Sequence, residues 1–464
     1  MFVSDFDERY DEILENIEDL FRERRYNDIR KLFLELYPND IAILFDDLPG
    51  ESIPVLFRLL SKEKAADVFV ELDSDDQELL IKGFSNTELE AILDDLYLDD
   101  TVDIIEEMPA NVVKRILKYS DPDTRKDINK ILQYPEDSAG SLMTTEFIRL
   151  RRDYSVADAF ETIRKKGDDA ETINVCYVTD ESRHLLGYVT IRTLVLEKDT
   201  GTKIGDIMDS QIIFMHTHDD KEDVAQEMSK YDFDAMPIVD SEERIVGIVT
   251  FDDAIDVMEE EATEDIEKMA AITPSDRPYL KTSVWEIWKS RIPWLLILMI
   301  SATFTGMIIT GFEDALASYV ALTAFIPMLM DTGGNCGSQA SVTVIRGISL
   351  QEIEFEDILK VIWKETRVAF FCGLTLAVVS FGKLLLFDGL IMGNAAVTPV
   401  VAAVVSATLL LTILCAKVVG CAMPLLAKKI GADPAVMASP FITTIVDALS
   451  LLIYFQFAKM ILGI

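Results

Sequence analysis

The chain has 464 residues, half of them hydrophobic, and a formal net charge of −38. Residues 1–280 hold 69 acidic and 31 basic side chains, whereas residues 281–464 hold 12 of each, so the whole excess lies in the first part. Such an acidic part repels nucleic acid, which is excluded as a partner. Five cysteines without a CxxC spacing argue against a zinc site or a disulfide framework. The composition predicts a multi-domain chain whose two parts lie in different solvents.

Residues 41–118 repeat a pattern of 12 residues. One register of the repeat is apolar throughout, at Leu44, Leu56, Val68, Leu80, Ile92, Ile104 and Ile116. Each unit corresponds to a short helix and a turn, which cannot bury its apolar face alone and must stack on its neighbours. We therefore expect an all-α helical solenoid as an N domain over residues 1–137.

Two similar stretches follow, over residues 138–200 and 201–251. Each has a helical run, at 156–165 or 221–230, and then two apolar strands, at 173–178 and 186–190 or at 235–239 and 245–250. Each copy ends in Gly-x-Val-Thr. This α/β pattern resembles a tandem pair of CBS domains, and such pairs commonly sense nucleotides or ions.

Residues 252–280 predict an acidic connecting helix. The spacing places Asp253, Asp256, Glu260, Glu264 and Glu267 on one helical face, where like charges repel. A charged run is usually a solvated face. The alternative is a mechanical link that packs against other acidic surfaces once bound cations relieve the repulsion.

Five segments are long and apolar enough to cross a bilayer, at residues 292–312, 316–345, 367–387, 395–424 and 435–458. Loops rich in Lys and Arg alternate with acidic loops. We therefore expect an all-α five-helix transmembrane domain over residues 281–464, in a multi-pass protein of the cell membrane. The N-terminus would be cytoplasmic and the C-terminus outside, with the lipid bilayer as a partner.

Two of these spans carry polar groups. The second contains the glycine-rich segment 331–339, whose glycines could leave carbonyls facing a water-filled path or form a helix-packing seam. The fifth contains Asp447, which is costly in a membrane unless it meets water, a partner or a cation. A structural ion pair of Asp447 with Lys417 or Lys383 is the alternative.

Four local motifs identify a family resemblance. They are Tyr134–Gly140, Glu261–Ile266, the Thr332–Asn335 segment with Gln339, and Asp433-Pro434-Ala435 leading to Asp447. With the order of domains, they make the chain similar to the MgtE family of magnesium channels. The resemblance implies a homodimer that takes up Mg²⁺ and is gated by intracellular Mg²⁺ bound to its acidic domains.

The resemblance also implies roles for particular residues. The pore and selectivity residues would be Asp447, Asn335, Gly334 and Gln339. The Mg²⁺ ligands, besides Asp447, would be Asp433, Asp220, Glu222, Asp232, Asp253, Asp256, Glu261, Glu264, Asp265, Asp95, Asp99 and Glu63. We expect Asp95 and Asp99 to lie one helical turn apart.

ATP is a further ligand that the resemblance raises. CBS nucleotide pockets often use Thr/Ser-x-x-Asp, which the second copy has at Thr250–Asp253. The first copy has Thr193 in place of the acid, which weakens the case for ATP, although Arg192 could meet a phosphate.

Three other functions compete with a magnesium channel. Oxygen-only ligands favour Mg²⁺, and a carrier for Mn²⁺ or Co²⁺ is the alternative. A membrane-anchored Mg²⁺ sensor without transport is the second, although an anchor needs neither Asp447 nor the glycine-rich segment. An enzyme is the third, and the sequence shows no nucleophile–base constellation for it. No P-loop appears either, which argues against nucleotide-driven pumping.

Overall fold

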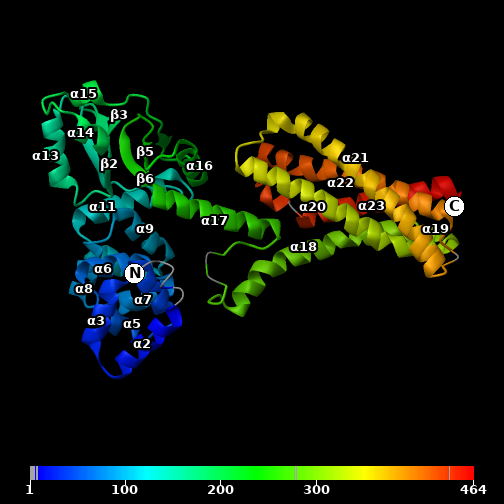
Figure 1. The fold of residues 1–464 in the computed structure, drawn as a ribbon, viewed down its shortest axis with the longest axis horizontal. Helices are drawn as coiled ribbons and strands as arrows, with labels where there is room; N and C mark the ends of the chain where they lie inside the picture. The colour runs from blue at the N-terminus through cyan, green and yellow to red at the C-terminus, as the bar shows by residue number, and fades with distance from the viewer. Residues whose placement is uncertain are drawn as a thin grey trace. The chain divides into compact units, whose positions relative to one another are not determined.

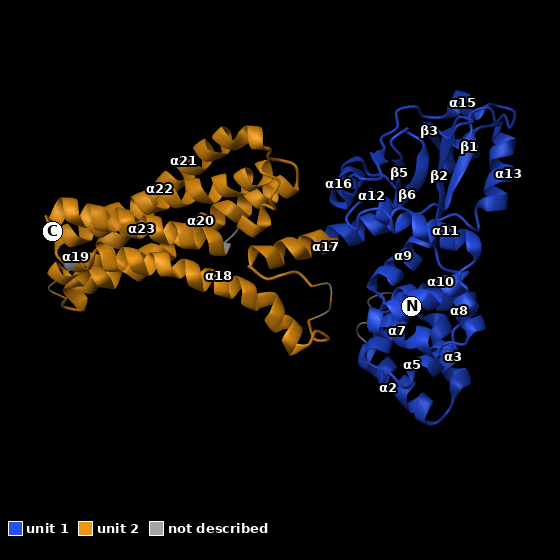
Figure 2. Cartoon of the chain, turned by 180° about the vertical axis from the view of Figure 1, so that it is seen from behind, with its two compact units in different colours: residues 1–258 blue, residues 259–464 orange. Residues whose placement is uncertain are grey.

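The computed structural model describes residues 6, 9–275, 277, 279–394, 396–437 and 439–463. The chain divides into two compact units, residues 1–258 and 259–464 (Figure 2).

Unit 1 begins with the predicted helical solenoid (Figure 1). Its helices are α2 (Tyr10–Arg22), α3 (Tyr26–Glu35), α4 (Pro38–Asp46), α5 (Ile53–Phe57), α6 (Lys62–Val70), α7 (Ser74–Gly83), α8 (Asn86–Leu93), α9 (Leu98–Glu107), α10 (Ala110–Tyr119) and α11 (Pro122–Ile131). The side chains of Ser61, Asp73 and Ser85 cap the N-termini of α6, α7 and α8. Most helices pack on the helix two positions further along the chain, as α4 does on α6 and α5 on α7. The apolar register of the 12-residue repeat is buried throughout, so the solenoid prediction is confirmed.

Two α/β repeats follow in unit 1, each with a three-stranded sheet. The first contains α12 (Ala139–Leu142), β1 (Phe147–Arg151), α13 (Val156–Lys166), β2 (Thr172–Thr179), β3 (Leu185–Thr190) and α14 (Ile191–Leu196). The second contains α15 (Ile204–Ile207), β4 (Met215–His216), α16 (Lys221–Tyr231), β5 (Ala235–Val239) and β6 (Ile245–Thr250). In both sheets the first two strands are parallel and the last two antiparallel. The predicted strands are present, and the opening strands β1 and β4 are additional.

The two repeats exchange backbone contacts in a nearly symmetric way. Thr144 bridges Ile248 of β6, and Asp209 bridges Tyr188 of β3. The strand glycines allow this approach, because a Cβ at Gly247 would lie 2.7 Å from the carbonyl oxygen of Thr144, and one at Gly187 would collide with the Asp209 carbonyl. The repeated Gly-x-Val-Thr is therefore a place where another segment crosses the strand.

The acidic helix α17 (Phe251–Met269) starts directly after β6 and contributes residues to both units. It is shorter than the predicted stretch 252–280. The chain turns at Ala271, whose φ is 55°.

Unit 2 is a helical bundle. It consists of α18 (Val284–Gly311), α19 (Glu313–Ser318), η1 (Val320–Phe325), α20 (Ile326–Ser349), η2 (Phe355–Asp357), α21 (Ile358–Lys383), the π-helix η3 (Leu384–Ile391), α22 (Pro399–Lys429), η4 (Ala435–Met437) and α23 (Ser439–Leu462). Helices α20, α22 and α23 pack on one another, α21 packs on α22, and α18 packs on α23.

Among the described residues, four helices are long and apolar enough to cross a membrane: Val284–Gly311, Phe355–Ile391, Pro399–Lys429 and Ala435–Leu462. They coincide with four of the five predicted spans. The remaining prediction, 316–345, covers the second half of α19, all of η1 and most of α20, so the long helix starts ten residues later than predicted. Helix α20 is too polar to count with the other four, because it contains Asp331, Asn335, Gln339 and Arg346.

Candidate functional site

Unit 1 contains a cluster of carboxylates drawn from three parts of the sequence. Helix α9 supplies Asp99 and Asp100, the first turn of α17 supplies Asp253, and the segment before β2 supplies Glu171. Asp99 is only 6% exposed. No described lysine or arginine forms an ion pair with any of the four.

Burial first, and then the charges of neighbouring acids, raises the pKa values of these groups. Burial, and then the charge of Asp253, raises the pKa of Asp99 well above its usual range. Burial and the charge of Asp253 raise the pKa of Asp100 to about 7. Burial and Asp100 raise the pKa of Glu171 to about 8. For Asp253, burial raises the pKa to about 6 although Thr250 opposes the shift.

The chemistry of this cluster suits a divalent cation, although its four groups do not form one of the described sets whose oxygens all lie within 4.8 Å of one another, which Asp46, Asp73 and Asp76 do. One carboxylate oxygen of Glu171 is buried without a hydrogen-bond partner among the described residues, and a buried acceptor without a partner is costly. Carboxylate oxygens are the ligands that Mg²⁺ prefers. Sequence reasoning selected Asp99 and Asp253 and missed Asp100 and Glu171. Asp100 could have been found as the neighbour of Asp99, but only the tertiary fold brings Glu171 here.

Asp253 has a second role as a cap. Its carboxylate accepts hydrogen bonds from the hydroxyl of Thr250 at 2.6 Å and from the Thr250 amide at 3.3 Å. In the first repeat the equivalent contact joins the hydroxyls of Thr190 and Thr193, 3.0 Å apart. Arg192 is exposed on α14. Its suggested contact with a phosphate stays a prediction.

Of the other predicted ligands of unit 1, Asp95 has its own partner, whereas Asp256 acts on Asp253 of this cluster. Asp95 lies in the turn between α8 and α9 and pairs with Lys62 at 2.8 Å. The expectation that Asp95 and Asp99 lie one helical turn apart on one helix is therefore wrong. The side chain of Glu63 lies outside the described residues. Asp256 acts electrostatically on Glu71 of the N domain, and burial followed by that charge raises the pKa of Glu71.

The predicted ligands around α16 have local structural roles. Asp220 caps the N-terminus of α16 by accepting from the Glu222 amide at 2.9 Å. A carboxylate oxygen of Glu222 accepts from the side-chain amide of Gln226 at 2.7 Å. Asp232 ends α16 with a φ of 54°. The structure does not bring these three into the buried cluster.

In unit 2, the predicted ligands Glu264 and Asp433 lie on either side of a lysine. The amine of Lys268 is 2.5 Å from Glu264 and 2.7 Å from Asp433. Burial, and then the charge of Asp433, raises the pKa of neighbouring Asp265. Glu261 lies half-buried on the same helix. Four predicted ligands therefore gather around the end of α17 and the loop before η4.

Asp447 lies half-buried within α23. Both lysines that could have paired with it have other partners: Lys417 pairs with Glu365 at 3.3 Å and Lys383 with Asp388 at 2.9 Å. The alternative of a structural ion pair is therefore wrong for these lysines. No described residue forms an ion pair with Asp447.

The glycines of α20 form a packing seam. Helix α20 runs without a break through residues 326–349, so its carbonyls bond within the helix and the expectation of free carbonyls is wrong. A Cβ at Gly333 would lie 2.7 Å from Thr412 and 3.0 Å from Val446, and one at Gly334 would collide with Thr443. Gly334 therefore faces α23 and is buried.

Asn335 and Gln339 lie on the exposed face of α20, one turn apart. Asp331 precedes Asn335 by one turn on the same face, and its negative charge acts on Asp447. Sequence reasoning placed Asp331 in the polar segment but not among the pore residues. Asp331 precedes Asn335 by four residues and Gln339 by eight, and this helical spacing could have identified it from the sequence.

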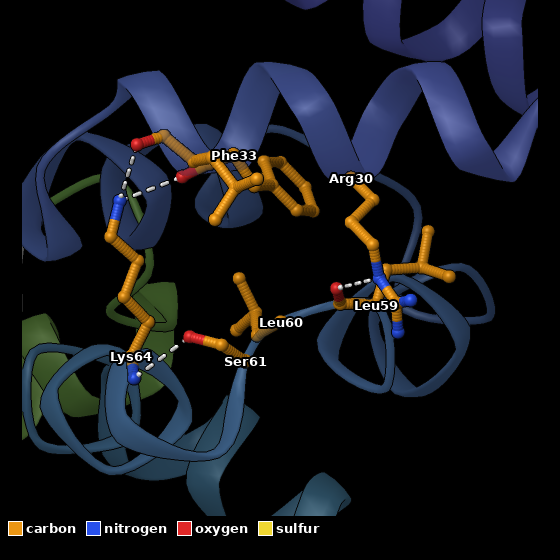
Figure 3. Close-up of a pocket in the computed structure, with 7 residues that line it drawn as sticks. Arg30, Phe33, Leu59, Leu60, Ser61 and Lys64 are labelled. Atoms are coloured by element: carbon orange, nitrogen blue, oxygen red, sulfur yellow. Dashed lines mark hydrogen bonds between the residues drawn. The ribbon is translucent and has the colours of Figure 1, made fainter.

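A pocket of about 310 Å³ lies in the solenoid, away from these acids (Figure 3). Its lining includes Arg30, Phe33, Leu59 and Lys64. The amine of Lys64 caps the C-terminal end of α3 by donating to the carbonyls of Phe33 and Leu36. The described residues that line the pocket include no carboxylate.

Family models and relatives match this arrangement. The model for the MgtE intracellular N domain matches residues 12–137, that for the CBS domain matches 139–198 and 204–260, and that for the MgtE divalent cation transporter matches 326–457. The chain is 35% identical to the magnesium transporter MgtE of Thermus thermophilus over 87% of this chain and 88% of the relative. It is 34% identical to the Bacillus subtilis protein of that name over 97% of each.

A crystal structure of the cytosolic domain of the Mg²⁺ channel MgtE in complex with ATP covers 53% of this chain and 99% of its own, with 35% identity and a TM-score of 0.50. The family models match in the order N domain, CBS domains and transporter. The chain belongs to the MgtE family of divalent cation transporters.

Proposed function

We propose that this protein carries Mg²⁺ across the cell membrane along a pathway that contains Asp447, and that intracellular Mg²⁺ closes this pathway. The observation that carries the transport proposal is Asp447 itself. A carboxylate within an apolar helix of the membrane bundle, with no described ion-pair partner, is a functional site by default. Asp331 and Asn335 extend the polar surface on α20.

A hydrated cation and a second copy of the chain explain the exposure of these groups. Mg²⁺ sheds its water reluctantly, so a pathway for the hydrated ion needs few protein ligands. The polar face of α20 is exposed in a single chain, where lipid would be a poor solvent for it. A homodimer whose two-fold axis runs beside α20 and α23 would enclose this face and place two copies of Asp447 along one pathway.

Five crossings complete the proposed topology. Helix α20 has 24 residues, about 36 Å at 1.5 Å per residue, which exceeds a hydrocarbon core of about 30 Å. Counted with the four apolar helices, it gives five spans. The basic loops then favour a cytoplasmic N-terminus and a C-terminus outside.

The buried carboxylates of unit 1 supply the proposed sensor. Asp99, Asp100, Asp253 and Glu171 would hold the ion. Bound Mg²⁺ supplies the positive charge that the cluster lacks. Without it the four groups repel one another, which weakens the contact of α9 with the first turn of α17. The ligand thus shifts the population toward the conformation in which these groups converge.

Transport along this pathway involves no covalent chemistry, so we infer that the protein is not an enzyme. ATP is at most a modulator. A similar cytosolic domain was crystallised with ATP, and Arg192 is the residue of this chain that would meet its phosphates.

The test is uptake of Mg²⁺ into liposomes that contain the purified protein and an internal dye. We expect Asp447→Ala and Asp447→Asn to abolish uptake while the protein stays folded, and Glu356→Gln, at an exposed carboxylate of η2, to leave it unchanged. Unchanged uptake in both Asp447 variants would remove this residue from the pathway. Absent wild-type uptake at low cytoplasmic Mg²⁺ would favour a sensor, and faster uptake of Mn²⁺ or Co²⁺ would favour a carrier for those ions.

A further inference from the structure

A buried ion pair joins α21 to α22 inside the membrane bundle. The amine of Lys417 lies 3.3 Å from a carboxylate oxygen of Glu365, and the two side chains are 7% and 13% exposed. Desolvation of two such charges offsets most of their attraction, so a pair of apolar side chains would hold the helices at least as well. Stability alone is therefore a weak reason for this pair.

The turn that carries Lys417 lies close to the turn that carries Asp447, because α20, α22 and α23 pack on one another. A Cβ at Gly337 of α20 would lie 3.3 Å from the carbonyl oxygen of Ala416, the residue before Lys417. The same Cβ would lie 3.3 Å from Val446, the residue before Asp447. Gly337 thus lies against the residue before Lys417 and the residue before Asp447 at once.

An unpaired ammonium at this position would act on cations beside Asp447. Protein and lipid screen charge much less than water does, and the interaction grows with the charge of the passing ion. We propose that Glu365 is the counter-charge that prevents Lys417 from repelling divalent cations at Asp447. Glu365 is a positioning residue in this role, because it acts through Lys417, and the inference rests on the proposed Mg²⁺ pathway.

The two single substitutions distinguish this role from a structural one. Glu365→Gln leaves a positive charge, and Lys417→Met leaves a negative one. If the charges act on the pathway, the two variants change cation flux in opposite directions. If the pair only holds α21 on α22, both variants lower flux, because each leaves a buried charge without its partner.

The experiment compares these variants with the double variant Glu365→Gln/Lys417→Met in the liposome assay, with thermal unfolding and size-exclusion profiles as controls for folding. We expect Glu365→Gln to lower Mg²⁺ uptake about tenfold or more, Lys417→Met to leave it at or above wild type, and the double variant to restore it. The loss should be larger for Mg²⁺ than for K⁺ flux through the same protein. Equal losses in both single variants, or a double variant no better than Glu365→Gln, would overturn the proposal.

A second readout separates failure of this inference from failure of the proposed function. Calorimetric titration of the detergent-purified protein with Mg²⁺ isolates the binding that Asp447→Asn removes. Glu365→Gln should weaken this binding, and the double variant should restore it, even if wild-type liposomes show no uptake. Asp447-dependent binding that Glu365→Gln leaves unchanged would overturn the proposal independently of transport.

Discussion

The side-chain amine of Lys268 on α17 lies 2.7 Å from a carboxylate oxygen of Asp433, in the loop before η4. The same amine contacts Glu264 at 2.5 Å. Burial lowers the pKa of Lys268, but the hydrogen bonds to Asp433 and Glu264 raise it more, so the pKa lies above its usual value and the amine stays charged. A tethered cation thus occupies the space between two carboxylates that are proposed Mg²⁺ ligands.

Lys268→Met should increase the affinity of this site for Mg²⁺. The substitution removes the competing charge and keeps most of the apolar stem, so Glu264 and Asp433 lose the cation that lies between them. We expect the Mg²⁺ concentration that half-protects the full-length protein from limited proteolysis to fall about tenfold, which corresponds to about 1.4 kcal/mol. Lys268→Arg, which keeps the charge, is the control. A midpoint that rises in Lys268→Met would show that the lysine supports the site.

The carboxylate cluster predicts a pH dependence of stability. The pKa values of Asp253, Asp100 and Glu171 are raised in the folded protein to about 6, 7 and 8. Between the ordinary carboxyl pKa of about 4 and these values, the folded state binds more protons than the unfolded state, so its stability falls as pH rises. Without Mg²⁺ the melting temperature of unit 1 in the full-length protein should therefore be higher at pH 5 than at pH 8.

Saturating Mg²⁺ should remove most of this difference, because it replaces the protons as the source of positive charge. Differential scanning calorimetry with and without a chelator measures both effects. A melting temperature that rises from pH 5 to pH 8 without Mg²⁺ would contradict the assignment of these groups as uncompensated acids.

Glu171→Gln tests a proposed Mg²⁺ ligand that only the tertiary structure revealed. The amide removes one negative charge, so we expect the variant to be more stable than wild type without Mg²⁺ and to gain less from added Mg²⁺. The Mg²⁺-induced shift in melting temperature measures the change. Glu161→Gln, at an exposed carboxylate on α13, should behave as wild type. An undiminished shift in Glu171→Gln would exclude this residue from the site.

Periodic patterns in the sequence predicted most of the fold, and contacts between distant segments account for what they missed. The 12-residue repeat and the alternation of strands depend on local burial, which a sequence shows directly. Strand β4 has two residues and is stabilised by pairing with β5, so no local pattern announces it. In α20, hydropathy placed the start of the helix too early, because the largely apolar residues 316–325 belong to the end of α19 and to η1 rather than to the long helix.

The same distinction between local patterns and distant contacts explains which residues of the candidate site could be predicted. Asp447 stood out because a carboxylate in an apolar segment is conspicuous on its own. Glu171 has no such mark, since its significance comes from Asp100 and Asp253, which are far away in the sequence. The partners of Lys417 and Lys383 were likewise unpredictable, because each lysine had several acids within reach.

Asp331→Asn should lower Mg²⁺ uptake less than Asp447→Asn does. Asp331 adds negative charge beside Asp447 from the exposed face of α20, which would raise the local concentration of cations. We expect a higher half-saturating Mg²⁺ concentration with a similar maximal rate, measured by dye-reported uptake over a range of external Mg²⁺. The control is Asp357→Asn, which changes a carboxylate of η2 that pairs with Lys360 of α21. A lower maximal rate without a change in half-saturation would give Asp331 another role.

Gly337→Ala tests the packing seam that sets α20 against α22 and α23. An added Cβ would lie 2.7 Å from Ile442 and 3.3 Å from the Ala416 carbonyl, so one of the helices must move. Overpacking of this kind costs about 1–3 kcal/mol, and we expect a lower melting temperature of the detergent-purified protein together with reduced uptake. At Gly306 in α18 nothing described lies within 4 Å of an added Cβ. There alanine should stabilise the helix by about 0.5–1 kcal/mol, so equal effects at the two glycines would show that α20 does not depend on close contact at Gly337.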